Sequence, residues 1–440
     1  MNRNRHSNFL AQLPRDWDQK PLGDIGRICS GGTPSRSESA FWNGTISWVT
    51  PRELTRLNNK WLVTTEERIT HSGLAGSSAA LMPIGSLLVT TRATIGAVAI
   101  AAVPVSTNQG FKNIDLHESV SPDFYYHLLK HISPEMVRLS SGTTFDEISR
   151  RDFARIIVPQ PSLSEQQRIA EILDTIDEAI RQTEALIAKL KQIKAGLLHD
   201  LLSRGLDDNG ELRDPVAHPE QFKDSELGRI PVEWEVRELG EITSKIADRD
   251  HTTPTYVEDG VIMVSPINFI RDEAIDFGAC KRIPFRDHIT NRRKTDVTFA
   301  DVILHRIGAG LGRVRLVTQQ MPEFSILHSL AMIRPNTCLV DPVYLLWAFR
   351  TDVIQRQMGL GTQSIGVPDL GLDKIAHLAF VLPAVNEQKH ITAVLSAHQR
   401  RIDIEESYRD KLLSLKRGLM DDLLTGRVRV AIPAGIAIPE

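Results

Sequence analysis

The sequence has few of the residues that build covalent or metal-bound frameworks, and it has no long apolar run. Its 440 residues include three cysteines, which lie far apart and form no Cys-x-x-Cys pair. This usage argues against a disulfide framework and against a zinc site. No apolar run approaches the ~20 residues that cross a bilayer, and the first residues lead into no apolar signal segment. We therefore expect a cytoplasmic protein without a membrane partner.

Neither sign of charge dominates the chain. Lys and Arg number 52 against 55 Asp and Glu, which gives a formal net charge of −3. The first 155 residues carry 17 cationic and 14 anionic side chains. This balance is too weak to hold nucleic acid through phosphate contacts alone, but it is compatible with the reading of base edges.

Motifs of the common enzyme classes are also missing. The chain has no Gly-Lys dipeptide, which excludes a P-loop, and its Gly308-x-Gly310-x-Gly312 run has the wrong spacing for a dinucleotide-binding loop. Asp373 and Lys374 are adjacent, so on a strand they would face opposite sides, unlike the acid and lysine of a nuclease core. Neither Asn-Pro-Pro-aromatic nor Asp-Pro-Pro-aromatic occurs, the tetrapeptides with which adenine methyltransferases hold a flipped base. We expect no catalytic residue, no metal and no cofactor in this chain.

One segment of the sequence occurs twice, as an internal repeat. Residues 161–202 recur as residues 383–424 without a gap, at a constant offset of 222 residues (387 − 165 = 222), and 15 of the 42 positions are identical. Both copies begin with Pro-x-x-x-Glu-Gln and end with Gly-Leu-x-x-Asp-Leu-Leu. A second, shorter repeat lies upstream of each copy, where Leu13-Pro14 with Trp17 matches Ile230-Pro231 with Trp234. The chain therefore consists of two tandem half-molecules.

The repeated segments are predicted helices. Each would extend over about 39 residues, roughly 58 Å at ~1.5 Å per residue, which is too long for burial within one domain. We expect the two helices to pack antiparallel as a coiled coil, and the alternative is two independent surface helices that each cover their own domain. Apolar residues recur at steps of three and four, the spacing of a coiled-coil seam, at Ile169, Leu173, Ile176, Ile180, Ile187, Leu190, Leu197 and Leu201 and at Ile391, Leu395, Ile402, Leu412, Leu419 and Leu423.

The repeat divides the chain into six expected parts. Short β-rich runs such as 45–49, 86–90 and 98–101 have counterparts at 261–264, 301–304 and 313–317, and a helix is expected after them, near 122–129 and 342–349. We predict an α+β fold of two globular domains, separated by the two long antiparallel helices and related by a pseudo-two-fold repeat. The expected parts are a domain at 1–160, a helix at 161–205, a linker at 206–230, a domain at 231–382, a helix at 383–427 and a tail at 428–440.

Polar clusters in turns beside the strands supply candidate binding residues. Arg, Asn and Gln suit the edges of guanine and adenine, whereas Ser, Thr and Lys suit phosphates. Ordinary turn chemistry explains any single cluster equally well. The candidates are Thr33, Ser35, Arg36, Trp48, Thr50, Arg52, Thr91, Arg92, Asn108, Gln109, Lys112, Thr143 and Thr144 in the first domain, and Thr253, Ser265, Asn268, Arg306, Arg313, Gln363 and Ser364 in the second.

Taken together, these features resemble a known family. Gly32-Thr33-Pro34-Ser35, the blocks 41–44, 46–51 and 106–111, and above all the doubled Pro-x-x-x-Glu-Gln-x-x-Ile are similar to the specificity subunits of type I restriction-modification systems. The resemblance covers essentially the whole chain. It implies a non-catalytic subunit whose two target-recognition domains read a bipartite, asymmetric sequence in double-stranded DNA.

The resemblance also implies partner subunits. Two methyltransferase subunits would dock on the paired helices, restriction/translocase subunits would join through them, and S-adenosylmethionine, ATP and Mg would belong to these partners. The residues expected at the docking surface are Glu165, Gln166, Ile169, Leu197, Leu201, Glu387, Gln388, Ile391, Leu419 and Leu423.

The two domains differ at their polar clusters. The second has Ser265-Pro266 where the first has Thr50-Pro51, and it has Ser325-Ile-Leu-His328 where Asn108-Gln109 is expected. We therefore expect the domains to read different half-sites. Two alternatives from other classes are a self-contained DNA-modifying enzyme and an adaptor that binds no DNA and is built on a duplicated coiled coil.

Overall fold

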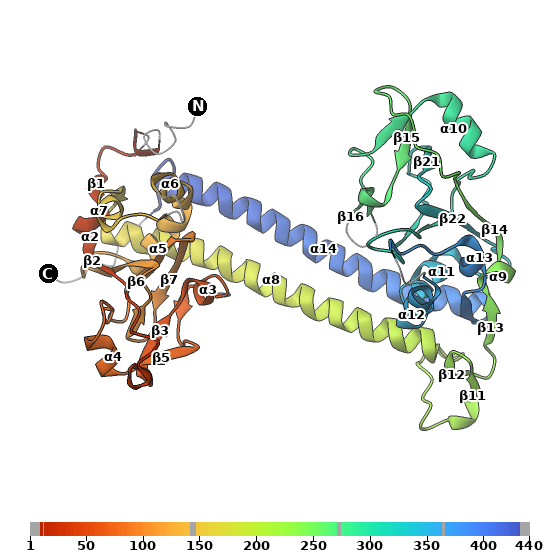
Figure 1. Ribbon diagram of the computed structural model, residues 1–440, viewed down its shortest axis with the longest axis horizontal. Helices are drawn as coiled ribbons and strands as arrows, with labels where there is room; N and C mark the ends of the chain where they lie inside the picture. The colour runs from red at the N-terminus through yellow and green to blue at the C-terminus, as the bar shows by residue number, and fades with distance from the viewer. Residues whose placement is uncertain (1–8, 12, 141–146, 271–273, 363–365, 432–440) are drawn as a thin grey trace. The chain divides into compact units, whose positions relative to one another are not determined.

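The computed structural model describes residues 9–11, 13–140, 147–270, 274–362 and 366–431 (Figure 1). The chain forms two compact units, one of Met1–Leu186 with Glu405–Glu440 and one of Ile187–Ile404. Two long helices, α8 (Leu163–Ser203) and α14 (Val385–Leu423), each contribute to both units. The globular part of the first unit is named domain 1 below, and that of the second is named domain 2.

Domain 1 is built on two sheets. One has the strand order β2-β9-β6-β7-β4, and the other has the order β5-β3-β8, in which β3 and β8 run parallel. Helices α5 (Pro122–His131) and α6 (Ser133–Leu139) pack against β7. The strands are β2 (Gly26–Ser30), β3 (Trp42–Val49), β4 (Trp61–Leu62), β5 (Glu67–Ile69), β6 (Leu87–Arg92), β7 (Thr94–Ala101), β8 (Val105–Thr107) and β9 (Phe111–Leu116).

Short elements complete domain 1. Strands β1 (Asp18–Pro21) and β10 (Ile157–Gln160) pair antiparallel and bring the start of the domain next to the start of α8. The core joins Leu87, Val89 and Ile114 of the sheet to Phe124 and Leu128 of α5. The remaining elements are α2 (Leu22–Ile25), η1 (Ser39–Phe41), α3 (Pro51–Leu54), α4 (His71–Ala75) and α7 (Arg150–Ala154).

Domain 2 repeats this topology, which confirms the predicted two-fold repeat. The order β14-β22-β19-β20 matches β2-β9-β6-β7, and β18-β15-β21 matches β5-β3-β8, again with a parallel pair, β15 and β21. The strands of the two sheets are β14 (Thr243–Asp248), β15 (Val261–Val264), β18 (Lys281–Ile283), β19 (Val302–His305), β20 (Val314–Leu316), β21 (Phe324–Ile326) and β22 (Leu330–Pro335).

The other elements of domain 2 follow the same plan. Strand β13 (Glu235–Glu238) pairs with β23 (Ala379–Leu382) as β1 pairs with β10. A hairpin of β11 (Phe222–Ser225) and β12 (Gly228–Pro231) forms at the end of the predicted linker and extends one residue beyond it. The remaining elements are η2 (Pro219–Gln221), α9 (Leu239–Ile242), η3 (Pro266–Asn268), β16 (Phe269–Ile270), β17 (Ala274–Ile275), α10 (Phe285–Arg292), α11 (Pro342–Ala348), α12 (Asp352–Gly361) and α13 (Leu372–Ala376).

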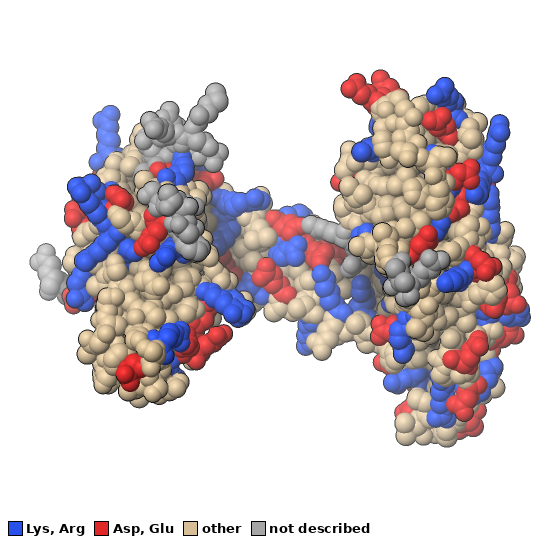
Figure 2. All heavy atoms as spheres, viewed as in Figure 1, with Lys and Arg blue, Asp and Glu red and all other residues tan. Residues whose placement is uncertain are grey.

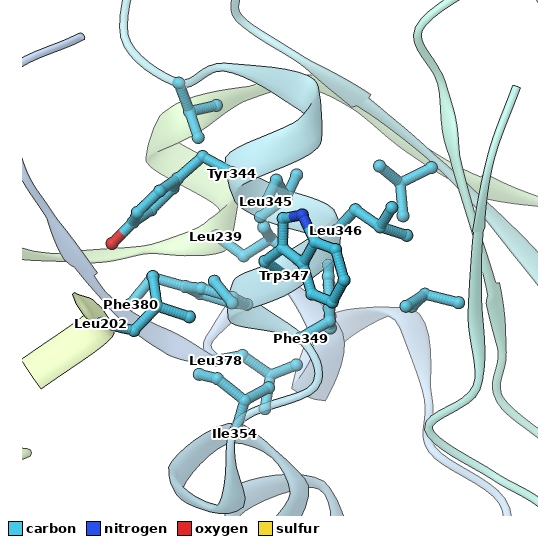
Figure 3. Packing of buried hydrophobic residues seen from close by; sticks show 14 of the residues in the cluster. Leu202, Leu239, Tyr344, Leu345, Leu346, Trp347, Phe349, Ile354, Leu378 and Phe380 are labelled. Carbon is cyan, nitrogen blue, oxygen red and sulfur yellow. The ribbon is translucent and has the colours of Figure 1, made fainter. Parts of the chain in front are cut away.

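Helix α11 lies at the centre of the core of domain 2. It begins where Asp341 accepts hydrogen bonds from the backbone N–H groups of Val343 and Tyr344, at 2.9 and 3.0 Å, and Pro342 occupies its first turn. Figure 3 shows its large side chains packed among Leu239, Ile354, Leu378 and Phe380. The rings of Phe349 and Phe380 meet almost edge to face, with centroids 5.0 Å apart.

In the first unit the two long helices pack antiparallel. Ile176 and Ile180 of α8 pack with Leu412 of α14 in one buried cluster. Asp177 forms an ion pair with Lys416, and Glu165, further back on α8, pairs with Arg429, further on in the chain. Rising numbers on one helix thus meet falling numbers on the other.

The same packing occurs in the second unit. Lys194 of α8 donates a hydrogen bond of 2.5 Å to Gln399 of α14, and these two residues are the repeat counterparts of Lys416 and Asp177. The predicted antiparallel packing is therefore confirmed within each unit. The alternative of two independent surface helices is wrong.

Candidate nucleic-acid interface

Four polar segments of domain 1 that are distant in the sequence meet at the ends of its strands. The N–H of Gly32 donates to the carbonyl of Thr107 at 2.9 Å, and the N–H of Asn108 donates to that of Val49 at 3.1 Å. The N–H of Thr91 donates to the carbonyl of Gly110 at 2.8 Å. The segments 31–36, 50–52, 91–92 and 108–110 therefore form one surface. Glycine is required at position 31, because a Cβ atom there would lie 1.8 Å from the carbonyl oxygen of Asn108.

Six of the candidates that reach solvent on this surface are here named the domain 1 face. The hydroxyl of Thr33 donates a hydrogen bond to the carboxamide oxygen of Gln109, which fixes that side chain beside the loop after β2. The Asn108 side chain accepts a hydrogen bond of 2.9 Å from the N–H of Gly110 and shapes the turn that presents Gln109. The domain 1 face consists of the exposed Thr33, Ser35, Arg52 and Gln109 and the half-buried Arg92 and Asn108.

Other candidates in domain 1 support the loops. Trp48 is buried and donates from its indole N–H to the carbonyl of Gly32 at 3.0 Å. Thr50 caps α3 in a capping box with Glu53, and Thr91 is fully buried. Sequence reasoning could not separate these roles from ligand contact, because capping and binding use the same residue types.

Arg36 is held in place by a cage of its own. Its guanidinium carbon lies 3.8 Å from the centre of the Trp42 ring and 5.2 Å from that of Trp48. Its nitrogens also pair with both carboxylate oxygens of Glu67. The hydrogen bond from Arg36 lowers the pKa of Glu67, although partial burial acts in the opposite direction.

The cation Lys112 is buried rather than presented to solvent. Its ammonium lies 3.3 Å from Glu147, and the same carboxylate lies 3.7 Å from Nε of Arg92. A direct phosphate contact by Lys112 would first require its pair with Glu147 to open. The neighbouring candidates Thr143 and Thr144 lie outside the described residues.

Strand register identifies the corresponding positions in domain 2. Ser30 is the partner of Lys112 in the β2–β9 pair, as Asp248 is the partner of Ala331 in the β14–β22 pair. Thr33 lies three residues after Ser30, and His251 lies three residues after Asp248, so His251 occupies the position equivalent to Thr33. The N–H of Leu327 donates to the carbonyl of Val264 at 2.9 Å, as Asn108 does to Val49, so His328 occupies the position of Gln109.

The candidates predicted for domain 2 are mostly engaged within the domain. The backbone N–H and hydroxyl of Ser265 donate to the side-chain oxygen of Asn268, at 2.9 and 2.8 Å, and cap η3. Arg313 donates to the backbone carbonyls of Phe269 and Pro266, both at 3.2 Å. Thr253 is exposed in the loop after β14. Gln363 and Ser364 lie outside the described part of the chain.

Arg306 is a buried cation that binds two acids. It donates to Asp248 at 2.7 Å and to Asp369 at 2.5 Å. Asp369 occupies the position of Glu147, because isolated bridges join Arg92 to Glu147 and Ile307 to Asp369. Each domain thus pairs a buried cation with an acid at the same place, although the cation comes from β9 in one domain and from the residue that follows β19 in the other.

The two glutamates of the repeated helix motif make their contacts inside their own units, where Glu165 is buried and Glu387 is half-buried. Glu165 accepts hydrogen bonds from the indole of Trp17 at 3.0 Å and from Arg429 at 2.7 Å. Glu387 accepts equivalent bonds from Trp234 at 3.0 Å and from Arg213 at 2.5 Å. These glutamates therefore hold each long helix against the domain that precedes it.

The glutamines of the motif act in the same way. Gln166 accepts from the N–H of Ser121 at 2.9 Å, and Gln388 accepts from the N–H of Asp341 at 2.7 Å. The apolar residues predicted for docking pack in the cores at the helix ends, where Ile169, Leu201, Ile391 and Leu423 are buried and Leu197 and Leu419 are partly buried. Their contact with a partner stays a prediction.

Neither a metal-binding group nor a membrane-spanning helix occurs among the described residues. In the residues with described positions, no group of three or more His, Cys, Asp or Glu side chains could hold a metal ion. No helix in this same part of the chain has the length and apolarity needed to span a bilayer.

Comparisons with known proteins identify the family. A family model described as type I restriction modification DNA specificity domain matches residues 14–192 and 231–414. The chain is 26% identical over 430 residues to the type I restriction enzyme MjaIX specificity subunit of Methanocaldococcus jannaschii, which covers 96% of this chain and 95% of that protein. It is 32% identical over 169 residues to the EcoR124I/EcoR124II specificity subunit of Escherichia coli, 37% of this chain and 41% of that protein.

A solved structure shares the fold. The type I restriction-modification S subunit from M. genitalium matches with a TM-score of 0.56 at 15% identity and covers 94% of this chain and 98% of that chain. Because the family model matches both halves, the chain belongs to the family of type I restriction-modification specificity subunits. This membership confirms the predicted class, a non-catalytic subunit with two target-recognition domains.

Replacing Arg306 tests whether this side chain stabilises domain 2. Arg306→Ala leaves the buried Asp248 without its closest cation, so we expect a loss of ~3–5 kcal/mol in unfolding free energy, measured as a lower midpoint in thermal or denaturant melts. The matched control is Arg52→Ala, an exposed position where ~0.5 kcal/mol or less is expected. Equal stability of the two variants would show that Arg306 does not hold domain 2 together.

Proposed function

We propose that this chain is the DNA sequence-recognition subunit of a type I restriction-modification complex, and that its two domains read different parts of one bipartite, asymmetric site. The observation that supports this most directly is a shared topology with different residues at equivalent face positions, Thr33 and Gln109 in domain 1 and His251 and His328 in domain 2. In this proposal residues 1–160 and 231–382 are the target-recognition domains.

In domain 1 we assign base reading to Gln109 and Arg92 of the domain 1 face. A carboxamide both donates and accepts hydrogen bonds, which suits the adenine edge, and a guanidinium suits the guanine edge. Thr33 and Ser35 supply hydroxyl groups suited to phosphate. Figure 2 supports a modest phosphate contribution, because cationic and anionic side chains are interspersed over each domain on the face that is drawn.

Methyltransferase and restriction/translocase subunits are the proposed partners of the long helices. Within the first unit, helix α14 exposes the large apolar side chains Tyr408 and Leu415, seven residues apart, and within the second unit α8 exposes Ile193. Exposed apolar side chains in such a row are typical of a surface that a partner covers. S-adenosylmethionine, ATP and Mg would be bound by these partners, two methyltransferase subunits among them.

Reconstitution with a methyltransferase partner tests this function. The purified chain alone is expected neither to methylate nor to cleave DNA, whereas the complex should methylate adenines within one bipartite sequence, mapped by sequencing of modified bases. Turnover by the isolated chain would favour a self-contained enzyme. A complex that methylates without sequence preference would favour an adaptor that binds no DNA.

A substitution on the domain 1 face tests its role in reading bases. Gln109→Ala should cost ~1–3 kcal/mol of discrimination and relax the preference in one half-site only, measured from methylation of duplexes with single base-pair changes. Gln19→Ala, at another exposed position of domain 1, is the matched control. A uniform loss on every duplex would mean that Gln109 positions or folds the domain.

We also propose that the long helices set the spacer length between the half-sites. Four residues inserted after Thr183 in α8 add about 6 Å at ~1.5 Å each, comparable to one or two base pairs. A four-residue insertion is a stutter that coiled coils tolerate. We expect a longer spacer with unchanged half-sites in the methylated sequence. An active complex with the original spacer would show that the helices do not set this distance.

A further inference from the structure

Domain 2 presents an apolar side chain at a place where domain 1 presents a cation. Strand β3 ends at Val49 and β15 ends at Val264, and each of these residues pairs with the last residue of the parallel neighbouring strand. The three residues that follow are Thr-Pro-Arg52 in domain 1 and Ser-Pro-Ile267 in domain 2. Ile267 therefore occupies the position of Arg52, and it is 82% exposed.

The same local contacts fix both positions. Thr50 and Ser265 each begin a short helix in a capping box, with Glu53 and Asn268 as their partners. Proline occupies the first turn of both helices. The match thus extends through the start of each helix, so the two exposed side chains occupy equivalent places on their domains.

Neighbouring groups hold the backbone of Ile267 in place. Arg313 donates hydrogen bonds to the carbonyls of Pro266 and Phe269, both at 3.2 Å, on either side of this residue. Phe269 is buried, and the guanidinium carbon of Arg315 lies 4.6 Å from the centre of its ring. Because isoleucine is β-branched, its side chain has little rotamer freedom to lose when it is covered. The exposed side chain is therefore pre-organised for a contact.

Ile267 lies beside other candidate binding positions of domain 2. The N–H of Leu327 donates to the carbonyl of Val264 at 2.9 Å, which brings the loop after β21, with His328, next to residues 265–267. The cation that follows β19, Arg306, binds two acids of its own domain. This part of the surface thus combines an inward-facing cation with an outward-facing apolar side chain.

The chemistry of the side chain limits what it can recognise. A single exposed apolar residue is ordinary and by itself indicates no ligand. Here the place is informative, because this surface is the one proposed to contact DNA. Isoleucine neither donates nor accepts hydrogen bonds, so it binds neither phosphate oxygens nor the polar groups of base edges. In the major groove, the C5-methyl of thymine is the group that matches an apolar side chain.

We propose that Ile267 is a specificity-determining residue that packs against the C5-methyl of one thymine in the domain 2 half-site. This contact removes apolar surface of both groups from water, which favours thymine over a pyrimidine without the methyl. At the equivalent place in domain 1, Arg52 suits a phosphate or a guanine edge. The proposal rests on the proposed function, because it requires that domain 2 read a half-site.

The test removes this methyl group alone. Thymines of the domain 2 half-site are replaced one at a time by deoxyuridine, which keeps the pairing with adenine. Binding of the full chain, in complex with its methyltransferase subunit, is measured on each duplex. The ratio of the affinities for the thymine and deoxyuridine duplexes cancels general effects of a variant on DNA binding.

Two variants and one control accompany the wild type. Ile267→Ala removes the contact, whereas Ile267→Val keeps a β-branched side chain. The control is Leu339→Ala, because Leu339 is also exposed but follows the end of β22, whereas the loop with His328 precedes the start of that strand. Substitutions at such exposed positions are expected to leave the fold intact, which thermal melts check.

At one thymine, the wild type should lose about fourfold in affinity on deoxyuridine, the factor that corresponds to ~0.8 kcal/mol for one buried carbon. Ile267→Ala should bind the two duplexes equally there, and Ile267→Val should retain most of the preference. The control should match the wild type. The thymine-to-deoxyuridine ratios in the domain 1 half-site should be the same in every variant.

The proposal is wrong if no thymine of the domain 2 half-site shows this effect, or if Ile267→Ala keeps it. Failure of Ile267→Ala to assemble with the methyltransferase subunit would place Ile267 in a subunit interface and would also overturn the proposal. These outcomes leave the proposed function intact. A wild-type complex without sequence preference would overturn the proposed function as well.

Discussion

The structure depends on two carboxylates in the first turns of the long helices, the buried Glu165 and the half-buried Glu387. A buried carboxylate is strongly destabilising unless cations and N–H donors surround it. Each one receives an indole N–H and an arginine, from Trp17 and Arg429 in one unit and from Trp234 and Arg213 in the other. The tryptophans belong to the start of each domain, and the glutamates belong to the helix that follows it. Equivalent contacts of the glutamate therefore hold the domain and the helix together in both units.

These contacts fix the geometry between each domain and its long helix, but they do not fix the residues on the candidate binding faces. The adjacent glutamines Gln166 and Gln388 satisfy backbone groups near α5 and α11, so the helix start and the domain core have to keep one geometry. The turns at the far ends of the strands are not part of that network. The fold can therefore stay constant while Thr33 and Gln109 are exchanged for His251 and His328. The proposed reading of two different half-sites by one repeated architecture requires this separation.

Much of the fold was predictable, because its signals are periodic. The offset of 222 residues and the heptad spacing of residues such as Ile169, Leu173 and Ile176 predict the repeat and its antiparallel helices. The candidate site was harder to predict. Thr50 and Ser265 have suitable chemistry for a ligand, but they cap short helices. Their roles depend on local backbone geometry, which residue type alone does not specify.

Burial of charged side chains was the second reason why the candidate site was hard to predict from the sequence. Lys112 and Arg306 look like phosphate contacts in the sequence, yet each pairs with an acid, Glu147 or Asp369, that is 35 or 63 residues away. The equivalence of His251 and His328 to Thr33 and Gln109 was missed for a related reason. The two histidines lie 77 residues apart (328 − 251 = 77) and become neighbours only once the β14–β22 register is known.

The internal ion pairs also bear on how such a protein would bind DNA. Arg36, Lys112, Arg306 and Arg313 are four of the candidate cations, and each is engaged by an acid, a ring or backbone carbonyls of its own domain. Counterion release depends on cations that are able to neutralise phosphates, so these side chains contribute little to it in this arrangement. They make the loops rigid instead. A rigid face of mostly neutral donors and acceptors favours discrimination between bases over general affinity, which agrees with a net charge of −3.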